Sequence, residues 1–251
     1  MFRRPFMKTL PIAASLAATL GVPFPAFAAM PVTVAILTTA PPFEYKDGAE
    51  LKGFEVDLLQ AIAAKEDLKL QYVEMKFEGM IPALQSHQVD VAAAGFFTTN
   101  ARKAVLDFSS PHYRQGNVLA TSISSPIRSF TDLKGATILA KKGAASVPVA
   151  DKLAVQYGAH VKVLNDEPSM YMDVATGQSQ ALVNDSAVIA YKIKIDGAHA
   201  SLRQVGAVLE EQDVAFAFPK GSALTKKFNE GLQKIKQNGE YKTIYSRYFA
   251  Q

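Results

Sequence analysis

Apolar and polar positions follow one another along this chain in two similar series of short hydrophobic runs and longer amphipathic segments. In the first series, the runs at 32–36, 70–73 and 89–93 predict strands. The segment after Gly53 places Phe54, Leu58 and Ile62 on one face, which predicts a helix, and 79–86 predicts a second, shorter helix. Strands and helices that alternate at this spacing are typical of parallel α/β units.

The second series begins after Ser124. It predicts strands at 137–140, 161–164, 181–183 and 214–218, with helices at 147–157, 169–175 and about 186–195. A turn of helix is expected at 131–135, and two helices close the chain. No Gly- or Ser-rich linker separates the series, so the chain is expected to form two α/β halves.

The N-terminus has the pattern of a secretory signal peptide. Arg3, Arg4 and Lys8 precede an apolar run at 10–24, and small residues follow before a cut after Ala28. The alternative is a membrane anchor, but three prolines interrupt a run that is short for a spanning helix of about 20 residues. We therefore expect residues 1–28 to be removed and the mature protein to be exported to the periplasm.

Composition and charge exclude several kinds of binding site and of catalysis. The formal net charge is +4, and the first 28 residues carry three basic and no acidic residues, which leaves +1 for the rest. Nucleic-acid binding is therefore not expected. The absence of cysteine excludes disulfides, thiolate metal sites and a lipid-modified cysteine. Four scattered histidines and the lack of phosphate-loop, dinucleotide or nucleophile-elbow motifs predict no metal, no cofactor and no covalent catalysis.

Two charged residues stand out by their local context. Thr99 is a good helix N-cap, which places Arg102 in the first helical turn, where a guanidinium can grip a carboxylate; an ordinary surface arginine is the alternative. Asp185 follows a predicted strand, at the edge where open α/β sheets bind ligands, or it simply caps the next helix. Glu55 and Asp57 are interpreted as acids that offset the helix dipole rather than as an acid/base pair.

The order of elements from Gly53 to Tyr113, with the stretch AAAGFFTTNARKAVLDFSSPHY, resembles the periplasmic solute-binding proteins of family 3. These proteins collect polar amino acids such as glutamine and histidine for ABC importers. The resemblance runs from about Val32 to Phe249 and includes the closing Asn238-Gly239-Glu240-Tyr241. It implies a type II, Venus-flytrap fold of two lobes: residues 29–116 and 218–251 form lobe 1, and 117–217 form lobe 2. Two hinge crossovers are expected at 117–121 and 213–217.

The resemblance also implies roles for individual residues. Arg102 would hold the α-carboxylate of the ligand, Asp185 its α-ammonium, and the backbone carbonyl of Gly95 would accept from the ammonium. Phe77 would form an aromatic wall, unless it is ordinary core. Lys141 aligns with a lysine that touches ligand in some glutamine binders, although a solvated lysine is the alternative.

Other pocket positions depart from the pattern of this family. An acid usually stands at position 37, an aromatic at 40 and a hydroxyl at 97, where this chain has Leu37, Ala40 and Phe97. Ala145 belongs to a Gly143–Ser146 loop that replaces a Gly-Thr-Thr type loop. The backbone N–H of Phe97 could still reach a carboxylate. The loss of an acid at 37 predicts that the side chain of the ligand is not cationic.

The expected function is that of a monomeric periplasmic binding protein, not an enzyme, which closes on an amino acid or a related zwitterion and docks on an inner-membrane ABC permease. One alternative is a cyclohexadienyl-dehydratase-like enzyme. Such relatives carry an acid three positions beyond Asp185, where this chain has Val188. The other alternative is a free-standing partner that presents ligand to a sensory receptor.

Overall fold

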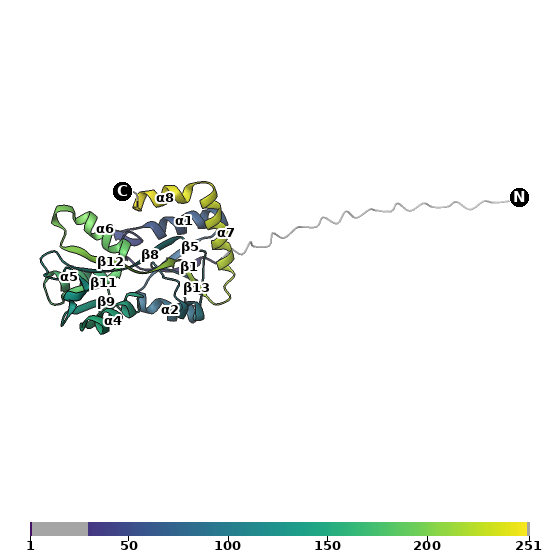
Figure 1. The fold of residues 1–251 in the computed structure, drawn as a ribbon. Coiled ribbons are helices and arrows are strands. Elements are labelled where there is room, and N and C mark those ends of the chain that lie inside the picture. The colour runs from purple at the N-terminus through teal and green to yellow at the C-terminus, as the bar shows by residue number, and fades with distance from the viewer. Residues whose placement is uncertain (2–29, 250–251) are drawn as a thin grey trace.

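The structure is a computed structural model that describes Met1 and residues 30–249. The expected signal peptide and its cleavage after Ala28 fall outside the described residues. Two five-stranded sheets form two lobes that lie side by side (Figure 1), and a third sheet has three strands. We call the lobe with the sheet of order β5-β1-β6-β13-β7 the first lobe, and the lobe with the order β10-β9-β11-β8-β12 the second lobe.

The first sheet is built mainly from the apolar runs that the sequence predicts as strands. Its members are β1 (Val32–Ile36), β5 (Leu70–Glu74), β6 (Val91–Ala93), β7 (Leu106–Phe108) and β13 (Ala217–Pro219). β1 pairs parallel with β5 and β6, as the α/β pattern predicts, while β13 pairs antiparallel with β6 and β7. A strand from the far end of the chain therefore lies inside the first sheet.

Helices cover both faces of this sheet (Figure 1). α1 (Phe54–Glu66), α7 (Leu224–Gln237) and α8 (Glu240–Phe249) bury Phe54, Phe228 and Ile244 in one core cluster. On the other face, α2 (Phe77–Gln85) buries Met80 and Leu84 in a second cluster. The short α3 (Asn100–Val105) leads into β7. The predicted helices after Gly53 and near 79–86 and the two closing helices are thus confirmed.

The second lobe repeats the arrangement. Its strands are β8 (Tyr113–Ser122), β9 (Thr137–Lys141), β10 (His160–Leu164), β11 (Ala181–Asp185) and β12 (Leu202–Val214). α4 (Ser146–Tyr157) packs on one face, and α5 (Glu167–Ala175) and α6 (Ser186–Asp196) pack on the other. Single turns of 3-10 helix cover Phe130–Leu133 and Gly197–His199. The strands and helices predicted between 137 and 195 are confirmed to within a few residues.

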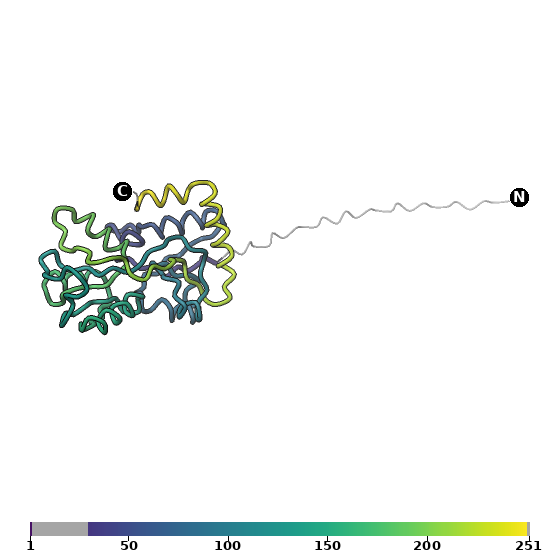
Figure 2. The backbone as a smooth tube through the Cα atoms, viewed as in Figure 1, coloured from purple at the N-terminus to yellow at the C-terminus, as the bar shows by residue number. Residues whose placement is uncertain are grey.

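The chain passes between the lobes along two paired strands. β8 and β12 run antiparallel, from Tyr113 opposite Val214 to Ser122 opposite Leu202, with two irregularities in register between Val205 and Gln212. Figure 2 shows these two passages together at the centre of the molecule. The predicted single strand at 214–218 is wrong, because β12 ends at Val214 in the second sheet and β13 begins at Ala217 in the first.

A small hairpin sheet was also not predicted. It consists of β2 (Thr39–Ala40), β3 (Glu44–Asp47) and β4 (Glu50–Lys52), and it occupies a segment with many polar residues. Gly53 ends this hairpin with a φ of 137°, and a Cβ there would lie 2.1 Å from the carbonyl oxygen of Phe43. Only glycine fits so close to a backbone carbonyl, so Gly53 fixes where α1 begins.

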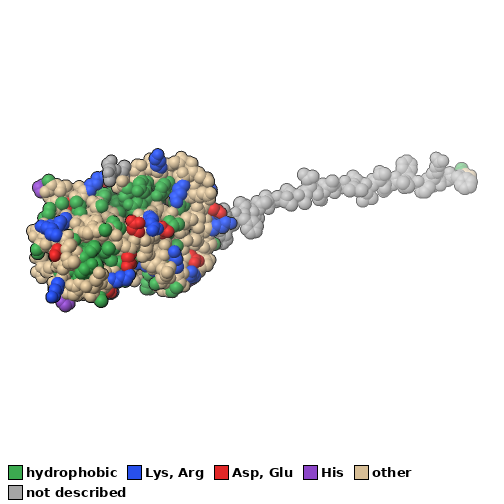
Figure 3. Space-filling view, in the orientation of Figure 1, with side chains coloured by type: hydrophobic (Ala, Val, Ile, Leu, Met, Phe, Trp, Pro, Cys, Tyr) green, Lys and Arg blue, Asp and Glu red, His purple; other side chains and the backbone are tan. Residues whose placement is uncertain are grey.

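Helix α6 ties the second lobe to the first. Val188 on α6 is only 2% exposed and packs in the first-lobe cluster that includes Phe54. The ring of Tyr191, also on α6, lies 6.3 Å from that of Tyr45 on β3. Between α6 and α8, Figure 3 shows a gathering of hydrophobic side chains, where residues of both lobes, among them Tyr191 and Tyr248, line a groove of about 310 Å³. The lobes are therefore in direct contact.

Candidate functional site

Arg102 is buried between the lobes and is not a surface arginine. The side chain of Thr99 accepts a hydrogen bond from the Arg102 backbone N–H at 3.3 Å, as the predicted N-cap requires. The guanidinium donates to the carbonyl of Phe97 at 3.0 Å and, across to the second lobe, to the carbonyl of Gly143 at 3.1 Å. It is therefore held by neutral acceptors from both lobes.

The surroundings of Arg102 suit an anion. Its guanidinium carbon lies 5.2 Å from the ring centroid of Phe77 and 5.1 Å from that of Phe96, and no residue of the described chain forms an ion pair with it. Burial lowers the pKa of Arg102 to about 10, and the negative charge of Asp185 opposes this shift. The guanidinium stays charged at neutral pH and buried, with bidentate donor geometry that matches a carboxylate.

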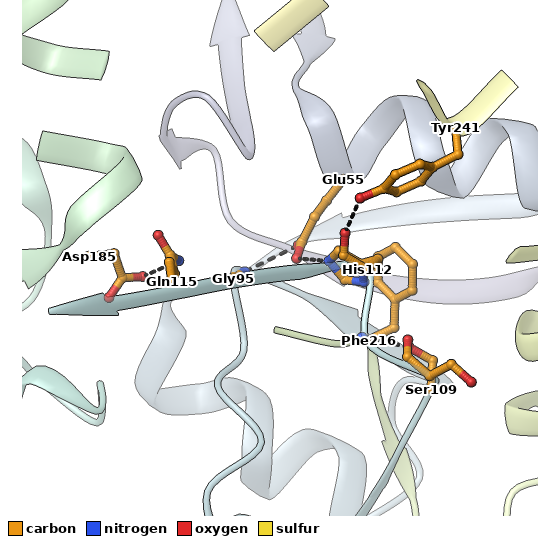
Figure 4. A network of polar contacts seen from close by, with 9 residues as sticks. Glu55, Gly95, Ser109, His112, Gln115, Asp185, Phe216 and Tyr241 are labelled. Carbon is orange, nitrogen blue, oxygen red and sulfur yellow. Dashed lines mark hydrogen bonds and ion pairs between the residues drawn. The ribbon is translucent and has the colours of Figure 1, made fainter. Parts of the chain in front are cut away.

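Asp185 faces this region from the second lobe. It ends β11, as predicted, but its side chain makes no capping hydrogen bond to α6, so the simple capping role is wrong. Instead its carboxylate accepts from Gln115 at 3.3 Å and from Asn117 at 3.1 Å, both on β8 (Figure 4 draws Gln115). Burial raises the pKa of Asp185 to about 6, while the positive charge of Lys141 opposes that rise.

At Gly95 the backbone of the first lobe comes close to Asp185. Gly95 has a φ of +61°, and a Cβ built on it would lie 3.7 Å from the Asp185 Oδ2 atom. Its backbone N–H donates to the Glu55 carboxylate at 3.1 Å (Figure 4). The structure thus brings together Arg102, Gly95 and Asp185, three residues that the sequence picked out separately. We call these three, with Lys141 and Glu167, the interlobe site.

Glu55 accepts the hydrogen bond that holds the backbone at Gly95. Besides the N–H of Gly95, it contacts His112 Nε2 at 2.8 Å, and both side chains are fully buried (Figure 4). The Tyr241 hydroxyl on α8 donates to the His112 carbonyl at 2.7 Å. Glu55 lies in the first turn of α1, as the sequence interpretation expects, and it also connects this turn to Gly95 and His112. Its partners lie 40 and 57 residues away, so no local pattern could reveal them.

Lys141 is buried and not solvated. Its ammonium forms an ion pair with Glu167 at the start of α5, and the exposed fractions of the two side chains are 6% and 1%. The same ammonium lies 5.0 Å from the ring centroid of Phe77 in the first lobe. The Thr39 hydroxyl, on β2, donates to Glu167 at 3.2 Å. Sequence reasoning missed Glu167, which resembles any acid in a first helical turn.

The remaining pocket candidates form an apolar wall. Leu37, Ala40 and Phe77 are buried in one cluster, and Phe77 stacks on Phe96 at 4.7 Å. Phe97 is buried too, and its carbonyl is an acceptor for Arg102. Ala145 is half-buried at the start of α4 in the loop that carries the Gly143 carbonyl. Contact of these residues with a ligand stays a prediction.

Glu44, on β3, is a further carboxylate that points into the same region. It is fully buried, and its side chain lies within hydrogen-bonding reach of the Glu55 carboxylate. Burial, and then the nearby charge of Glu55, raises its pKa well above the usual range, while Lys141 opposes the rise.

Within residues 30–249 the structure contains no group of three His, Cys, Asp or Glu side chains that could hold a metal ion. Over the same range, no helix combines the length and the apolar character that a membrane span requires. At the position where a dehydratase-like enzyme was expected to carry an acid, Val188 is packed in the first-lobe core.

Comparisons with known proteins identify the family of this chain. Residues 32–251 match the bacterial extracellular solute-binding proteins, family 3. The arginine-binding extracellular protein ArtP of Bacillus subtilis is 31% identical over 208 residues, which cover 83% of this chain and 82% of that protein. The L-arginine-binding protein of Pseudomonas aeruginosa is 31% identical over 257 residues, 97% of each chain.

Solved structures show the same fold. An ancestral arginine-binding protein bound to arginine superposes with a TM-score of 0.81 at 34% identity and covers 87% of this chain and 98% of its own. The expected two-lobed, type II periplasmic binding protein fold is therefore confirmed. The relatives are named as binding proteins and not as enzymes. This chain belongs to the bacterial extracellular solute-binding proteins, family 3.

Proposed function

We propose that this chain is the periplasmic binding component of an ABC importer and that it binds an amino acid between its lobes. The observation that carries the proposal is a pair of opposite charges supplied by different lobes: Arg102 from α3, which is buried, and Asp185 from the end of β11, which is half-buried. Arg102 would take the α-carboxylate of the ligand, and Asp185 with the Gly95 carbonyl would take its α-ammonium. Leu37, Ala40, Phe77, Phe97 and Ala145 would surround the remainder of the ligand.

Closure of the lobes would complete this site. Among the hydrogen bonds that cross between the lobes are those from Arg102 to Gly143 and from Thr39 to Glu167. Asp185 is held by Gln115 and Asn117 on β8, one of the two strands that run between the lobes. A ligand that binds Asp185 would therefore act directly on the crossing strand. The hinges would lie at 117–121 and 213–217. Residues 29–116 and 218–251 would then form lobe 1, and residues 117–217 would form lobe 2.

Relatives named for arginine and for glutamine support an amino acid as the ligand. Residues 1–28 would be the signal peptide, and the mature protein would act as a monomer that delivers its ligand to an inner-membrane permease. Neither nucleic acid nor a cofactor takes part in this function.

A thermal-shift screen of residues 29–251 against the common amino acids tests the proposal. A ligand at about 100 times its Kd adds roughly 2.7 kcal/mol of stability, which gives a clear rise in melting temperature. We expect Arg102→Ala and Asp185→Ala to abolish this rise, and the exposed residues Arg128→Ala and Asp151→Ala to leave it intact. No rise with any amino acid, or a rise that survives both site substitutions, would refute the proposal.

A further inference from the structure

Gln115 on β8 makes two hydrogen bonds with its side-chain amide, and both lead to the start of α6. Its nitrogen donates to the Asp185 Oδ2 atom at 3.3 Å (Figure 4), and its oxygen accepts from the backbone N–H of Ala187 at 3.2 Å. Only 4% of Gln115 is exposed. The amide therefore joins a strand that passes between the lobes to the carboxylate that the proposed function assigns to the ligand ammonium.

The N–H of Ala187 is one that Asp185 would ordinarily bind. Asp185 is the N-cap of α6, and the side-chain oxygen of an N-cap aspartate usually accepts from the backbone N–H two or three residues later. The N-cap of α5 shows this arrangement, because Asp166 accepts from the N–H of Ser169 at 2.8 Å. At α6 the Gln115 oxygen takes the N–H instead, and the Asp185 side chain makes no capping hydrogen bond.

The consequence is that Asp185 stays directed at the first lobe. A carboxylate that capped its own helix would use its oxygens on backbone N–H groups and not on a ligand. Here the Oδ2 atom, which Gln115 holds, lies 3.7 Å from the position of a Cβ built on Gly95 in the first lobe. Asn117 donates to the other oxygen, Oδ1, at 3.1 Å. Both donors belong to β8, so this strand sets the direction of the carboxylate.

We propose that Gln115 is a positioning residue, which accepts the Ala187 N–H in place of Asp185 and thereby keeps the Asp185 carboxylate available for the α-ammonium of the ligand. This inference rests on the proposed function. Without the Gln115 amide, the partly buried N–H of Ala187 would have no acceptor, which is unfavourable. Asp185 would then turn to cap α6, and its contact with the ammonium would be lost.

Gln115→Met tests this role, because it removes both hydrogen bonds and keeps an unbranched side chain. The probes are arginine and glutamine, for which relatives are named, each paired with its des-amino analogue, which lacks only the α-ammonium. Any other amino acid that the thermal-shift screen identifies is treated in the same way. By calorimetry we expect the wild-type protein to bind the amino acid at least about tenfold more tightly than the analogue, which leaves Asp185 without a cation.

Gln115→Met should reduce this ratio to within about threefold. The control Gln204→Met, which alters an exposed amide on β12, should leave the ratio unchanged. A second comparison separates positioning from support of the fold. If Gln115 acts through Asp185, Gln115→Met weakens amino-acid binding at least about tenfold in the wild-type background but less than about twofold in an Asp185→Asn background.

Nuclear magnetic resonance gives a test that needs no variant. An N–H that donates to a carboxylate changes its chemical shift strongly when that carboxylate ionises. Across the titration of Asp185, whose pKa is about 6, the side-chain N–H of Gln115 should move and the backbone N–H of Ala187 should move much less. An Ala187 N–H that follows the titration as strongly as Gln115 overturns the proposal, because Asp185 would then cap α6 itself.

The binding outcomes have separate meanings. A wild-type protein that binds the amino acid and its analogue equally, a Gln115→Met variant that keeps the full ratio, or an equal loss in both backgrounds overturns the role of Gln115 while amino-acid binding stands. A wild-type protein that binds no common amino acid overturns the proposed function and this inference with it. Melting curves without ligand establish that each variant is folded before its affinity is measured.

Discussion

The buried ion pair between Lys141 and Glu167 allows a quantitative test of the electrostatics of this site. Lys141→Met keeps most of the side-chain volume but leaves the Glu167 carboxylate without a counter-charge, among the further carboxylates of Glu44 and Asp185. Removing one partner of a buried ion pair is strongly destabilising. We therefore expect a large fall in the free energy of unfolding.

Protonation sets an upper limit on that fall, because Glu167 can become neutral instead. Keeping a glutamate with an ordinary pKa of about 4.3 neutral at pH 7 requires 2.7 pH units at 1.36 kcal/mol each, or about 3.7 kcal/mol. At pH 5 the same limit is about 1 kcal/mol. Because an unpaired buried carboxylate is unfavourable, the folded variant binds a proton more readily than the unfolded chain does, and the variant recovers stability as the pH falls.

Urea unfolding of residues 29–251, followed by circular dichroism at pH 7 and pH 5, measures both values. The control is Lys152→Met, which breaks the exposed Lys152–Glu210 pair and should cost less than about 1 kcal/mol at either pH. The double variant Lys141→Met/Glu167→Gln, which leaves neither of the two charges unpaired, should recover at least half of the loss. A loss of equal size at pH 7 and pH 5 would refute the reasoning, because it would show that an unpaired carboxylate is not the cause.

Three further outcomes are expected. Gly53→Ala places a Cβ 2.1 Å from a backbone carbonyl oxygen, so it should lower the free energy of unfolding by several kcal/mol or prevent folding, as urea titration would show. Because the pKa of Asp185 is about 6, ammonium binding should weaken about tenfold per pH unit below that value; a flat calorimetric Kd between pH 7 and pH 4.5 would contradict this role. Tyr241→Phe removes the 2.7 Å hydrogen bond to the His112 carbonyl and should lower the free energy of unfolding in urea by about 1 kcal/mol. The matched control Tyr245→Phe, at an exposed residue, should lower it less.

The sequence predicts those parts of the fold in which local pattern and final burial agree. The apolar run that became β1 and the stripe containing Phe54 that became α1 are clear because each buries a continuous hydrophobic surface. β12 was missed because exposed positions, among them Val208, Glu210 and Glu211, interrupt its buried residues, so the strand shows neither a continuous apolar run nor a clear alternation. What defines β12 as a strand is its pairing with β8, about 80 to 100 residues earlier in the chain.

The residues of the site also differ in whether local sequence reveals them. Arg102 could be found because its N-cap, Thr99, stands three residues away in a stretch that resembles the family. Glu167 and Glu44 could not, because they are marked only by burial and by charges brought from other elements. A carboxylate in a first helical turn or on a polar hairpin is usually solvated, and only the folded chain shows that both of these are enclosed.

The position of β13 determines the order in which the lobes can form during synthesis. The strands of the second sheet all lie between Tyr113 and Val214, so a growing chain holds that entire sheet before its last residues are made. The first sheet needs Ala217–Pro219 between β6 and β7, and its outer face needs α7 and α8, which come later still. The lobe that begins the chain is therefore the last to be completed, and until then its apolar strands stay open to chaperones and to other chains.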